Sequence, residues 1–163
     1  MADLYLMMGV PGSGKTTFLK NRVTKETSII ISRDTIRFSL LKEGEEYFSH
    51  EKEVVKIFWE KINNALAEGK DVFIDQTSLT PRSRRYLLEH INGYTYTNLI
   101  WINEPLETCL KRNELRRNTK AYVPRSTIKR MFDQLIEPSL DEGFNKIYVY
   151  NSNTNTFKIY ERR

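Results

Sequence analysis

The sequence contains one cysteine, Cys109, among 163 residues, and no long hydrophobic run. A single cysteine excludes a disulfide within the chain, so we expect Cys109 to be a small buried apolar residue in a reducing compartment. The apolar run near the N-terminus, 4–10, is too short to cross a bilayer, and no basic segment with a small-residue cleavage site flanks it. These absences predict a cytoplasmic protein that does not interact with a membrane.

Repeats, low-complexity tracts and linkers rich in Pro, Gly or Ser are also absent. The length, with 39% hydrophobic and 29% charged residues, predicts one globular domain over 1–163. Continuous apolar runs of strand length alternate with stretches of helical period, and these runs lie at 4–10, 28–32, 72–75, 97–103 and 146–151. Strands that are apolar along their whole length are typical of sheets covered on both faces. We therefore expect an α/β fold: a doubly wound, mainly parallel sheet with helices on both faces.

Apolar stripes and end signals indicate three of the helices. One stripe runs over 54–66, and a second helix begins at Pro81. A third helix has its stripe over 128–136 and is ended by Pro138. The last residues, 151–163, predict a turn followed by an edge strand.

The net charge of +5 is unevenly distributed along the chain. Residues 111–130 include eight basic residues and one acidic residue, so this segment carries +7 and the rest of the chain −2. Because unpaired charge is unfavourable in a protein interior, the segment must face solvent or an anionic ligand. A solvated helix face and a ligand-binding segment both satisfy this condition.

The stretch GVPGSGKT, from Gly9 to Thr16, fits the pattern G-x-x-x-x-G-K-[ST] between an apolar strand and a helical stretch. Its glycines allow successive N–H groups to point at phosphate oxygens, and the helix N-terminus adds a positive end. Lys15 would reach the β- and γ-phosphates, and the Thr16 hydroxyl would ligate Mg²⁺. No separate guanine-reading N-K-x-D stretch is present, which favours ATP. The predicted ATP-binding residues of this loop are Gly9, Pro11, Gly12, Ser13, Gly14, Lys15, Thr16 and Thr17.

The loop does not specify the reaction, because GTPase switches, motor ATPases and small kinases all carry it. Asp75, at the end of the third predicted strand, can hold Mg²⁺ through water or can cap and brace the loop. Arg82, Arg84 and Arg85 follow within one helical turn. They suit either a solvated face or contact with an anionic substrate.

Asp34 follows a buried apolar strand, at the sheet edge where doubly wound folds bind ligands. A carboxylate beside the γ-phosphate can orient a hydroxyl group and accept its proton. Arg37, one helical turn later, would then clamp a phosphate-bearing acceptor, whereas a helix N-cap is the alternative role of Asp34. Arg112 and Arg116, spaced i, i+4, predict a basic helical lid over about 112–124 that closes on the γ-phosphate.

Five stretches of the sequence carry a family resemblance. They are GVPGSGKTT, SRDTIR, VFIDQTSLTPRSR, KRNELRRNTKAYVP and IEPSLDEGFNKI. Together they resemble the kinase domain of polynucleotide 5′-hydroxyl kinases, both the phage type and the kinase half of the eukaryotic bifunctional 5′-kinase/3′-phosphatase enzymes. The P-loop occurs in many families, whereas the R-D-x-x-R element, the Arg-rich lid before VP and the E-P-x-x-x-E-G-F run are more specific. The resemblance extends from near Met7 to Ile147, in the order of the family.

The resemblance implies a P-loop kinase that uses ATP and Mg²⁺ and phosphorylates the 5′-hydroxyl end of DNA or RNA. It implies catalytic roles for Lys15, Asp34 and Arg116, and a role for Thr16 at the metal. Arg112 would join Arg116 on ATP, and Arg37 would contact the acceptor. From their positions in the sequence, rather than from the resemblance, we also expect Asp75 and Arg84 to contact the acceptor.

The chain also departs from the family pattern. Ser78 stands where the family often has Asn in a D-x-T-N element, so the contacts made from that loop differ. No D-x-D pair of a phosphatase and no nucleotidyl-ligase lysine motif is present, which predicts a stand-alone kinase. Two alternatives stay open: a P-loop kinase of a small alcohol such as a sugar, nucleotide-sugar or antibiotic, and a non-transferring ATPase or nucleotide switch with Gln76 as its water-positioning residue. The sequence leaves the oligomeric state undetermined.

Overall fold

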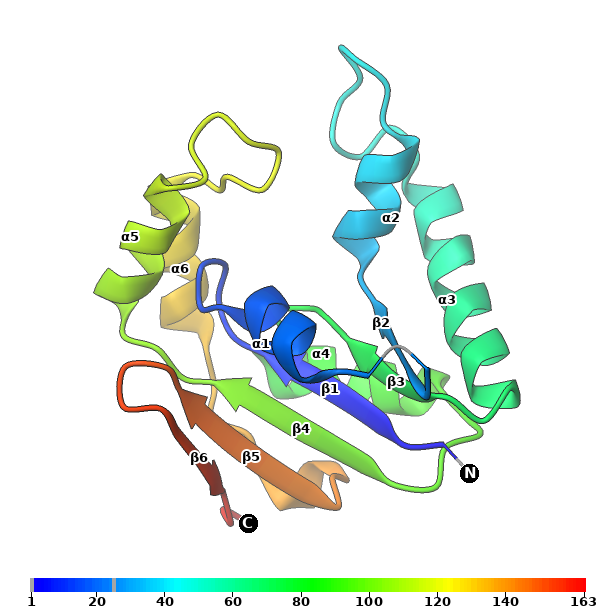
Figure 1. The fold of residues 1–163 in the computed structure, drawn as a ribbon. Coiled ribbons are helices and arrows are strands. Elements are labelled where there is room, and N and C mark those ends of the chain that lie inside the picture. Colours follow the sequence, from blue (N-terminus) through cyan, green and yellow to red (C-terminus); the bar gives the residue numbers. More distant parts are fainter. Residues whose placement is uncertain (1, 25) are drawn as a thin grey trace.

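The computed structural model describes residues 2–24 and 26–163, in which six strands form one twisted sheet (Figure 1). The strands are β1 (Leu4–Met8), β2 (Ser28–Ile31), β3 (Asp71–Ile74), β4 (Thr97–Ile102), β5 (Lys146–Asn151) and β6 (Thr156–Ile159). The helices are α1 (Lys15–Arg22), α2 (Arg33–Leu40), α3 (Glu51–Ala67), α4 (Pro81–His90), α5 (Leu106–Glu114) and α6 (Arg125–Gln134), with a short 3₁₀ helix η1 (Leu140–Glu142). The strand order is β2-β3-β1-β4-β5-β6, and only the last pair, β5 and β6, is antiparallel within the described residues.

The predicted doubly wound, mainly parallel sheet is confirmed. All five predicted strands are present, and each begins and ends within two residues of its predicted bounds. The C-terminal residues form the expected turn and edge strand. Helix α4 begins at Pro81, and the Thr80 hydroxyl accepts from the Ser83 N–H at 3.2 Å in a capping box.

One helix boundary was predicted wrongly. The apolar stripe over 128–136 was expected to stay helical until Pro138, but α6 ends at Gln134 and Leu135 is extended, with ψ of 124°. The Ile136 N–H donates to the Leu79 carbonyl oxygen at 2.9 Å instead of continuing the helix. A tertiary backbone contact therefore ends this helix before proline does.

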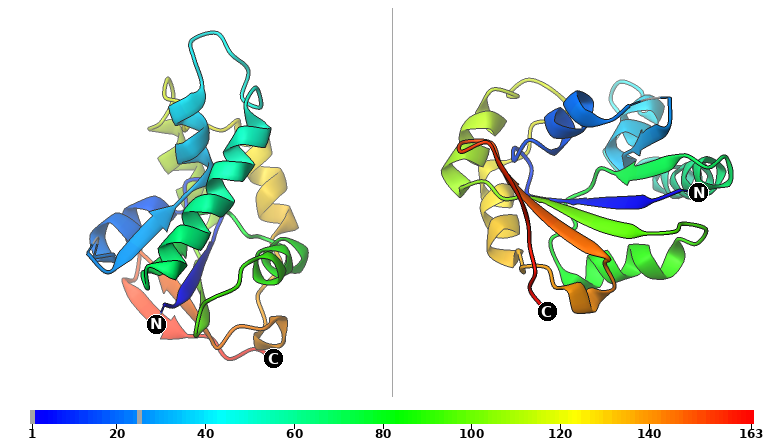
Figure 2. Two further views of the ribbon diagram at one scale, coloured as in Figure 1. Left: turned by 90° about the vertical axis from the view of Figure 1, so that its right-hand side faces the viewer. Right: turned by 60° about the horizontal axis from the view of Figure 1, so that its bottom comes forward.

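The two faces of the sheet pack against different helices (Figure 2). Helices α3 and α4 cover one face, where the largest cluster of buried side chains lies. That cluster includes Leu4, Leu6, Phe58, Ile62, Val72, Leu87 and Leu99. Helix α1 covers the other face with Phe18 and Leu19, against Met7 and Ile100 of the sheet. Helices α5 and α6 share a third cluster, in which Cys109 is fully buried as expected.

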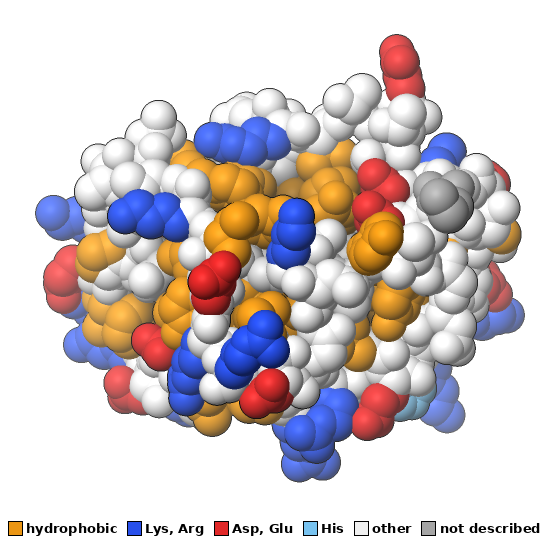
Figure 3. All heavy atoms as spheres, turned by 90° about the horizontal axis from the view of Figure 1, so that it is seen from below, with side chains coloured by type: hydrophobic (Ala, Val, Ile, Leu, Met, Phe, Trp, Pro, Cys, Tyr) orange, Lys and Arg blue, Asp and Glu red, His pale blue; other side chains and the backbone are white. Residues whose placement is uncertain are grey.

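The carboxyl ends of the central strands carry the segments in which site residues were predicted. The β1–α1 turn lies there, with α2 on one side and the α5–α6 loop on the other (Figure 1). The underside of the molecule, opposite this edge, shows acidic and basic side chains interspersed around hydrophobic ones (Figure 3). Among residues 2–24 and 26–163, none of the helices combines the length and hydrophobicity that a membrane crossing requires.

Candidate active site

The turn between β1 and α1 forms the predicted phosphate-binding loop. Gly14 directly precedes α1 and has a φ of 102°, a conformation that favours glycine. Gly12 has a φ of 86°, and a Cβ atom at this position would collide with the carbonyl oxygen of Cys109 on α5. The loop can therefore turn under the first N–H groups of α1 and pack directly against α5 only because both positions lack a side chain.

Lys15 lies inside this loop. Its Nζ donates to the carbonyl oxygens of Gly9 at 2.8 Å and Val10 at 3.1 Å. Burial lowers the pKa of Lys15 to about 8, although the nearby Asp75 carboxylate acts in the opposite direction. The two carbonyl oxygens carry only partial negative charge, so a triphosphate bound in the loop would balance the charge of the Lys15 ammonium group more fully.

Thr16 and Asp75 bring two oxygen donors together beside the loop. The Thr16 hydroxyl donates to Asp75 Oδ2 at 2.8 Å. Mg²⁺ prefers oxygen ligands and usually combines one or two protein groups with phosphate oxygens and water. Because no group of three or more His, Cys, Asp or Glu side chains in the described residues is arranged for a metal, the ion would need phosphate oxygens as well. This pair fits the predicted Mg²⁺ site, with Thr16 as a ligand.

Two cavities lie on opposite sides of the loop. The α2 cavity, of 540 Å³, extends toward α2 and is lined by Lys15, Thr16, Asp34, Asp75 and the α5–α6 loop. The α1 cavity, of 400 Å³, lies between α1 and α5. Of the other predicted ATP-binding residues, two line the α2 cavity, Pro11 and Gly12. Three line the α1 cavity, namely Ser13, Thr17 and Arg112. Gly9 lies at the start of the loop, where its N–H donates to the Thr77 carbonyl oxygen. Gly14 and Arg116 line both cavities, so the two meet at the head of the loop.

Residues 112–114 end helix α5, and residues 115–124 form a loop of turns rather than a continuation of the predicted helical lid. Helix α5 ends at Glu114, and Arg116 therefore lies in a turn beyond the helix. Asn113 closes this loop, because its side chain donates to the Val123 carbonyl oxygen at 2.6 Å and accepts from the Val123 N–H at 3.0 Å. Sequence reasoning missed Asn113, since its partner is ten residues away.

Within this loop, Arg116 and its neighbour Arg117 differ in their partners. The Arg117 guanidinium is paired with Glu114 at 3.0 Å. No hydrogen bond or ion pair engages the Arg116 side chain within residues 2–24 and 26–163, although it is partly buried at the junction of the cavities. Arg116 is thus available to an anionic group at the head of the loop, as its predicted role requires.

Arg112 supports the phosphate-binding loop from the other side. Its Nη1 donates to the Ser13 carbonyl oxygen at 2.8 Å, and its Nη2 donates to the Ser152 hydroxyl at 2.6 Å. Ser152 in turn donates to the buried Glu104 carboxylate at 2.6 Å. The predicted contact of Arg112 with ATP stays a prediction, and the structure adds a bracing role. Sequence reasoning missed Glu104 and Ser152, which sit in short polar stretches without a motif.

Asp34 lies in the first turn of α2 and lines the α2 cavity. The N-cap of this helix is Ser32, whose hydroxyl accepts from the Thr35 N–H at 3.3 Å, so the alternative role of Asp34 as the N-cap is wrong. Asp34 Oδ1 accepts from Arg37 Nη1 at 2.5 Å and from the Tyr47 hydroxyl. Oδ2 has no partner in the described part of the chain, and the side chain is 58% exposed. One carboxylate oxygen is therefore held while the other is free.

Arg37 does not occupy the predicted position. It is 5% exposed and lies behind the cavity wall, where it donates to both carboxylate oxygens of Glu51 at 2.8–3.1 Å and to the Tyr47 hydroxyl at 2.7 Å. The prediction that Arg37 clamps an acceptor phosphate is wrong in this structure, because the guanidinium is directed at protein partners. It positions Asp34 instead.

Tyr47 and Glu51 complete this network and were missed from the sequence. Burial and the adjacent Asp34 carboxylate raise the pKa of Tyr47, so its hydroxyl stays protonated and donates to Asp34. The available signal was the aromatic pair Tyr47–Phe48 in the otherwise polar stretch KEGEEYFSH. Exposed aromatic side chains in a polar loop indicate a contact surface.

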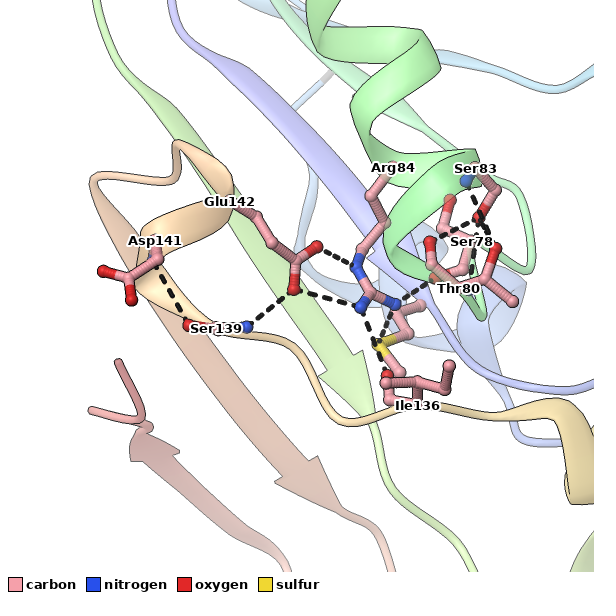
Figure 4. A network of polar contacts seen from close by, with 9 residues as sticks. Ser78, Thr80, Ser83, Arg84, Ile136, Ser139, Asp141 and Glu142 are labelled. Atoms are coloured by element: carbon pink, nitrogen blue, oxygen red, sulfur yellow. Dashed lines mark hydrogen bonds and ion pairs between the residues drawn. The ribbon is translucent and has the colours of Figure 1, made fainter.

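Arg84 is fully buried and lines neither cavity, which contradicts its predicted contact with the acceptor. The side chain is 0% exposed and forms a bidentate pair with Glu142, at 2.6 and 3.1 Å (Figure 4). It also donates to the carbonyl oxygens of Ser78 at 2.9 Å and Ile136 at 3.2 Å. Its neighbours Arg82 and Arg85 are exposed but line neither cavity. Arg84 therefore joins α4 to the segment around η1 and has no free donor directed at a ligand.

Comparisons with known proteins bear on the family and the fold of this chain. The chain is 28% identical over 155 residues to a protein of Acanthamoeba polyphaga mimivirus named as a bifunctional polynucleotide phosphatase/kinase. The match covers 89% of this chain and 32% of the viral protein, so the chain spans about a third of its relative. The predicted resemblance to polynucleotide kinases is confirmed by this match.

Solved structures share the fold at lower identity. A chain in the structure of the Pnkp1/Rnl/Hen1 RNA repair complex is 22% identical, with a TM-score of 0.72 over 99% of this chain and 49% of that one. A gluconokinase from Sinorhizobium meliloti 1021 is 17% identical, with a TM-score of 0.58 over 91% of this chain and 82% of that one.

The fold is therefore that of a P-loop kinase, and the sequence match extends across most of it. A family model described as an AAA domain matches residues 4–138, which include the phosphate-binding loop, Asp34 and the α5–α6 loop. The chain belongs to this AAA domain family.

Proposed function

We propose that residues 1–163 act as one P-loop kinase domain that transfers the γ-phosphate of ATP to the 5′-hydroxyl of a DNA or RNA end. The observation that carries this proposal is the meeting of two cavities at Gly14 and Arg116. A kinase must hold a donor and an acceptor on opposite sides of the transferring phosphoryl group. ATP would occupy the α1 cavity and the loop, and the acceptor would enter the α2 cavity.

Asp34 acts as the general base in this proposal. Its free Oδ2 accepts the proton of the acceptor hydroxyl as the oxygen attacks the γ-phosphorus, and ADP leaves. Arg37 and Tyr47 hold Oδ1 and so fix the direction of the other oxygen. Lys15 and Arg116 stabilise the charge on the transferring phosphoryl group from the loop and from the lid 112–124.

Thr16 and Asp75 would hold Mg²⁺ with the nucleotide phosphates. When bound, the ion neutralises phosphate charge. Asp75 also accepts from Thr16, so it keeps the hydroxyl oxygen at the edge of the α2 cavity.

Two observations support nucleic acid as the acceptor: basic side chains at the α2 cavity and the name of the viral relative. The α2 cavity is bordered by Arg116 and Lys120 of the basic segment 111–130, which suits a substrate that carries phosphate groups. The viral relative is named for polynucleotide phosphatase and kinase activities. A cytoplasmic location accords with this proposal.

The test is transfer of labelled γ-phosphate from ATP to matched single-stranded RNA and DNA oligonucleotides with 5′-hydroxyl ends. Sugars and nucleosides compete as acceptors in the same mixture. Wild type, Asp34→Asn and Asp141→Asn are run side by side, since Asp141 is an exposed aspartate of η1 outside both cavities. We expect labelled oligonucleotide with wild type and Asp141→Asn, and transfer slower by roughly 10²- to 10⁴-fold with Asp34→Asn.

Other outcomes would identify a different enzyme. Label only on a sugar or nucleoside would make the domain a small-alcohol kinase. Label only as free phosphate, with or without oligonucleotide, would make it a non-transferring ATPase.

A further inference from the structure

A buried carboxylate lies next to the α1 cavity without lining it. Glu104, in the connection between β4 and α5, is 3% exposed. Its Oε1 accepts twice from Ser152, once from the backbone N–H and once from the hydroxyl, each at 2.6 Å. A buried charge is unfavourable without partners, and hydrogen bonds to a charged group are strong. The carboxylate therefore fixes the position of Ser152.

The turn that carries Ser152 is also held by its neighbours. Ser152 follows β5, and the side-chain amide of Asn151 donates to the Asn103 carbonyl oxygen at 2.9 Å. The Asn103 N–H donates to the Tyr150 carbonyl oxygen at 2.9 Å. These bonds join the same two connections as the Glu104–Ser152 pair. Ser152 therefore has a defined place on the wall of the α1 cavity, which it lines.

The Ser152 hydroxyl links this carboxylate to Arg112. It accepts from Arg112 Nη2 at 2.6 Å and donates to Glu104, so it stands between the two charged groups. Nη1 of the same guanidinium donates to the Ser13 carbonyl oxygen at 2.8 Å. A Cβ atom on Gly14 would lie only 3.2 Å from this Nη1. Arg112 is thus held against the head of the phosphate-binding loop.

The hydroxyl between the two charges has an electrostatic consequence. The attraction between unit charges falls as their separation grows, so a guanidinium kept one hydroxyl away from a carboxylate is less neutralised than in a direct ion pair. More of its positive charge is then left for the phosphates of ATP. Without the hydroxyl, the Glu104 carboxylate would draw Arg112 away from Ser13.

We infer that Ser152 is a positioning residue for ATP, because its hydroxyl holds Arg112 at the phosphate-binding loop and apart from Glu104. This inference rests on the proposed function, in which ATP occupies the α1 cavity, and adds a residue that sets the affinity for the nucleotide. The role belongs to ATP binding rather than to the transfer step, since Asp34 lies in the other cavity.

The experiment measures binding of a non-hydrolysable ATP analogue with Mg²⁺ by calorimetry, without any acceptor. Wild type is compared with Ser152→Ala, Ser152→Thr, Arg112→Ala and the double variant Ser152→Ala/Arg112→Ala. Asn153→Ala is the matched control, because Asn153 is an exposed neighbour on the same turn that lines neither cavity. Thermal melting establishes that each variant is folded, and steady-state transfer assays give KM for ATP and kcat.

We expect Ser152→Ala to weaken binding of the analogue about tenfold, the usual effect of losing a hydrogen bond to a charged group. KM for ATP should rise by a similar factor, while kcat at saturating ATP stays close to wild type. Ser152→Thr keeps the hydroxyl and should restore most of the affinity. Asn153→Ala should match wild type.

The double variant tests whether Ser152 acts through Arg112. If it does, Ser152→Ala should add almost nothing to the loss caused by Arg112→Ala, because the group that it positions is already absent. A residue that only supports the fold would instead add its own penalty in both backgrounds.

Three results would overturn the inference. Wild-type affinity in Ser152→Ala would show that the hydroxyl does not matter, and equal losses in Ser152→Ala and Ser152→Thr would assign the effect to something other than the hydroxyl. Additive losses in the double variant would separate Ser152 from Arg112. In each case phosphate transfer to an oligonucleotide by wild type would still stand. Transfer only to a sugar or nucleoside would refute the proposed acceptor and leave the result at Ser152 intact, because binding is measured without an acceptor.

Discussion

Two arginine–glutamate pairs in this chain have similar geometry and different surroundings. Arg84 pairs with Glu142 and Arg37 pairs with Glu51, and both arginines donate to the two oxygens of their carboxylate. The Glu142 side chain is 10% exposed, and two carbonyl oxygens accept from the remaining Arg84 donors. The Glu51 side chain is 34% exposed, and Arg37 has a second carboxylate partner, Asp34.

The difference separates a structural pair from a positioning pair. At Arg84 the charges neutralise each other inside the protein, and the hydrogen bonds join elements that are far apart in the sequence (Figure 4). At Arg37 the same chemistry is extended to Asp34, of which only one oxygen is engaged. The first arrangement stabilises the fold, whereas the second restrains a carboxylate that lines a cavity and has one oxygen without a partner. Substitutions in the two regions should therefore separate stability from activity.

The largest effect on activity is expected at Asp34, the carboxylate that Arg37 holds by one oxygen. Asp34→Asn removes the proton acceptor but keeps the size of the side chain, so kcat should fall by roughly 10²- to 10⁴-fold, the usual contribution of a general base. ATP-analogue affinity and melting temperature should stay close to wild type, because the fold does not depend on Oδ2. Rapid-quench transfer assays and calorimetry provide the two measurements. A large fall in melting temperature would place Asp34 with the structural pairs.

Glu142→Ala tests the structural pair. It leaves the fully buried Arg84 without its carboxylate, and removing one partner of a buried ion pair costs about 3–5 kcal/mol. For a chain of this size the melting temperature should fall by about 10 °C. Transfer activity per folded molecule, measured at a temperature well below melting, should be retained. Lost activity in the folded variant would show that the Arg84 network acts on the site.

Arg116 and Arg117 offer the same comparison within one loop. Arg116→Ala should lower kcat by about 10²-fold, because its unpaired guanidinium is available to the transferring phosphoryl group. Arg117 is 61% exposed and already paired with Glu114, so Arg117→Ala should leave kcat unchanged. Single-turnover rates at saturating ATP measure both. Equal effects would mean that the loop acts only through its total charge.

The roles of these arginines mark the limit of what the sequence predicts. The strands followed from continuous apolar runs and the phosphate-binding loop from a local motif, since both depend on neighbouring residues. Arg37 and Arg84 were identified as charged groups near a site, but their carboxylate partners lie 14 and 58 residues away. Only the tertiary structure decides whether a guanidinium meets a protein carboxylate or is left for a ligand.

The same limit applies to the lid. The spacing of Arg112 and Arg116 fits one helix face, yet the Asn113–Val123 contact closes the segment as a loop. Arg112, in the last turn of α5, bonds to the Ser13 carbonyl oxygen, whereas Arg116 lies in the turn beyond the helix. A helical spacing therefore does not ensure that both side chains face the same ligand.

Glu51→Ala sharpens the comparison with Glu142→Ala. Arg37 would keep Asp34 as a carboxylate partner, and Glu51 is partly exposed, so the loss of stability should be on the order of 1 kcal/mol. We expect kcat to fall by about tenfold, because a less restrained Arg37 positions Asp34 less well. Urea unfolding and steady-state kinetics measure the two effects. A stability loss as large as that of Glu142→Ala would make both pairs structural.

The smallest effect concerns pH and the charge of Lys15. Burial lowers its pKa to about 8, and bound phosphates would raise it, so ATP binding should be accompanied by proton uptake above that pH. Affinity for an ATP analogue should be nearly constant at lower pH and weaken by about threefold between pH 7.5 and 8.5, as the free enzyme loses the lysine proton. Isothermal titration in buffers of different ionisation enthalpy would measure affinity and proton uptake together. Lys15→Arg keeps its charge over this range, so its affinity should show no such change; the same pH dependence in this variant would assign the titration to another group.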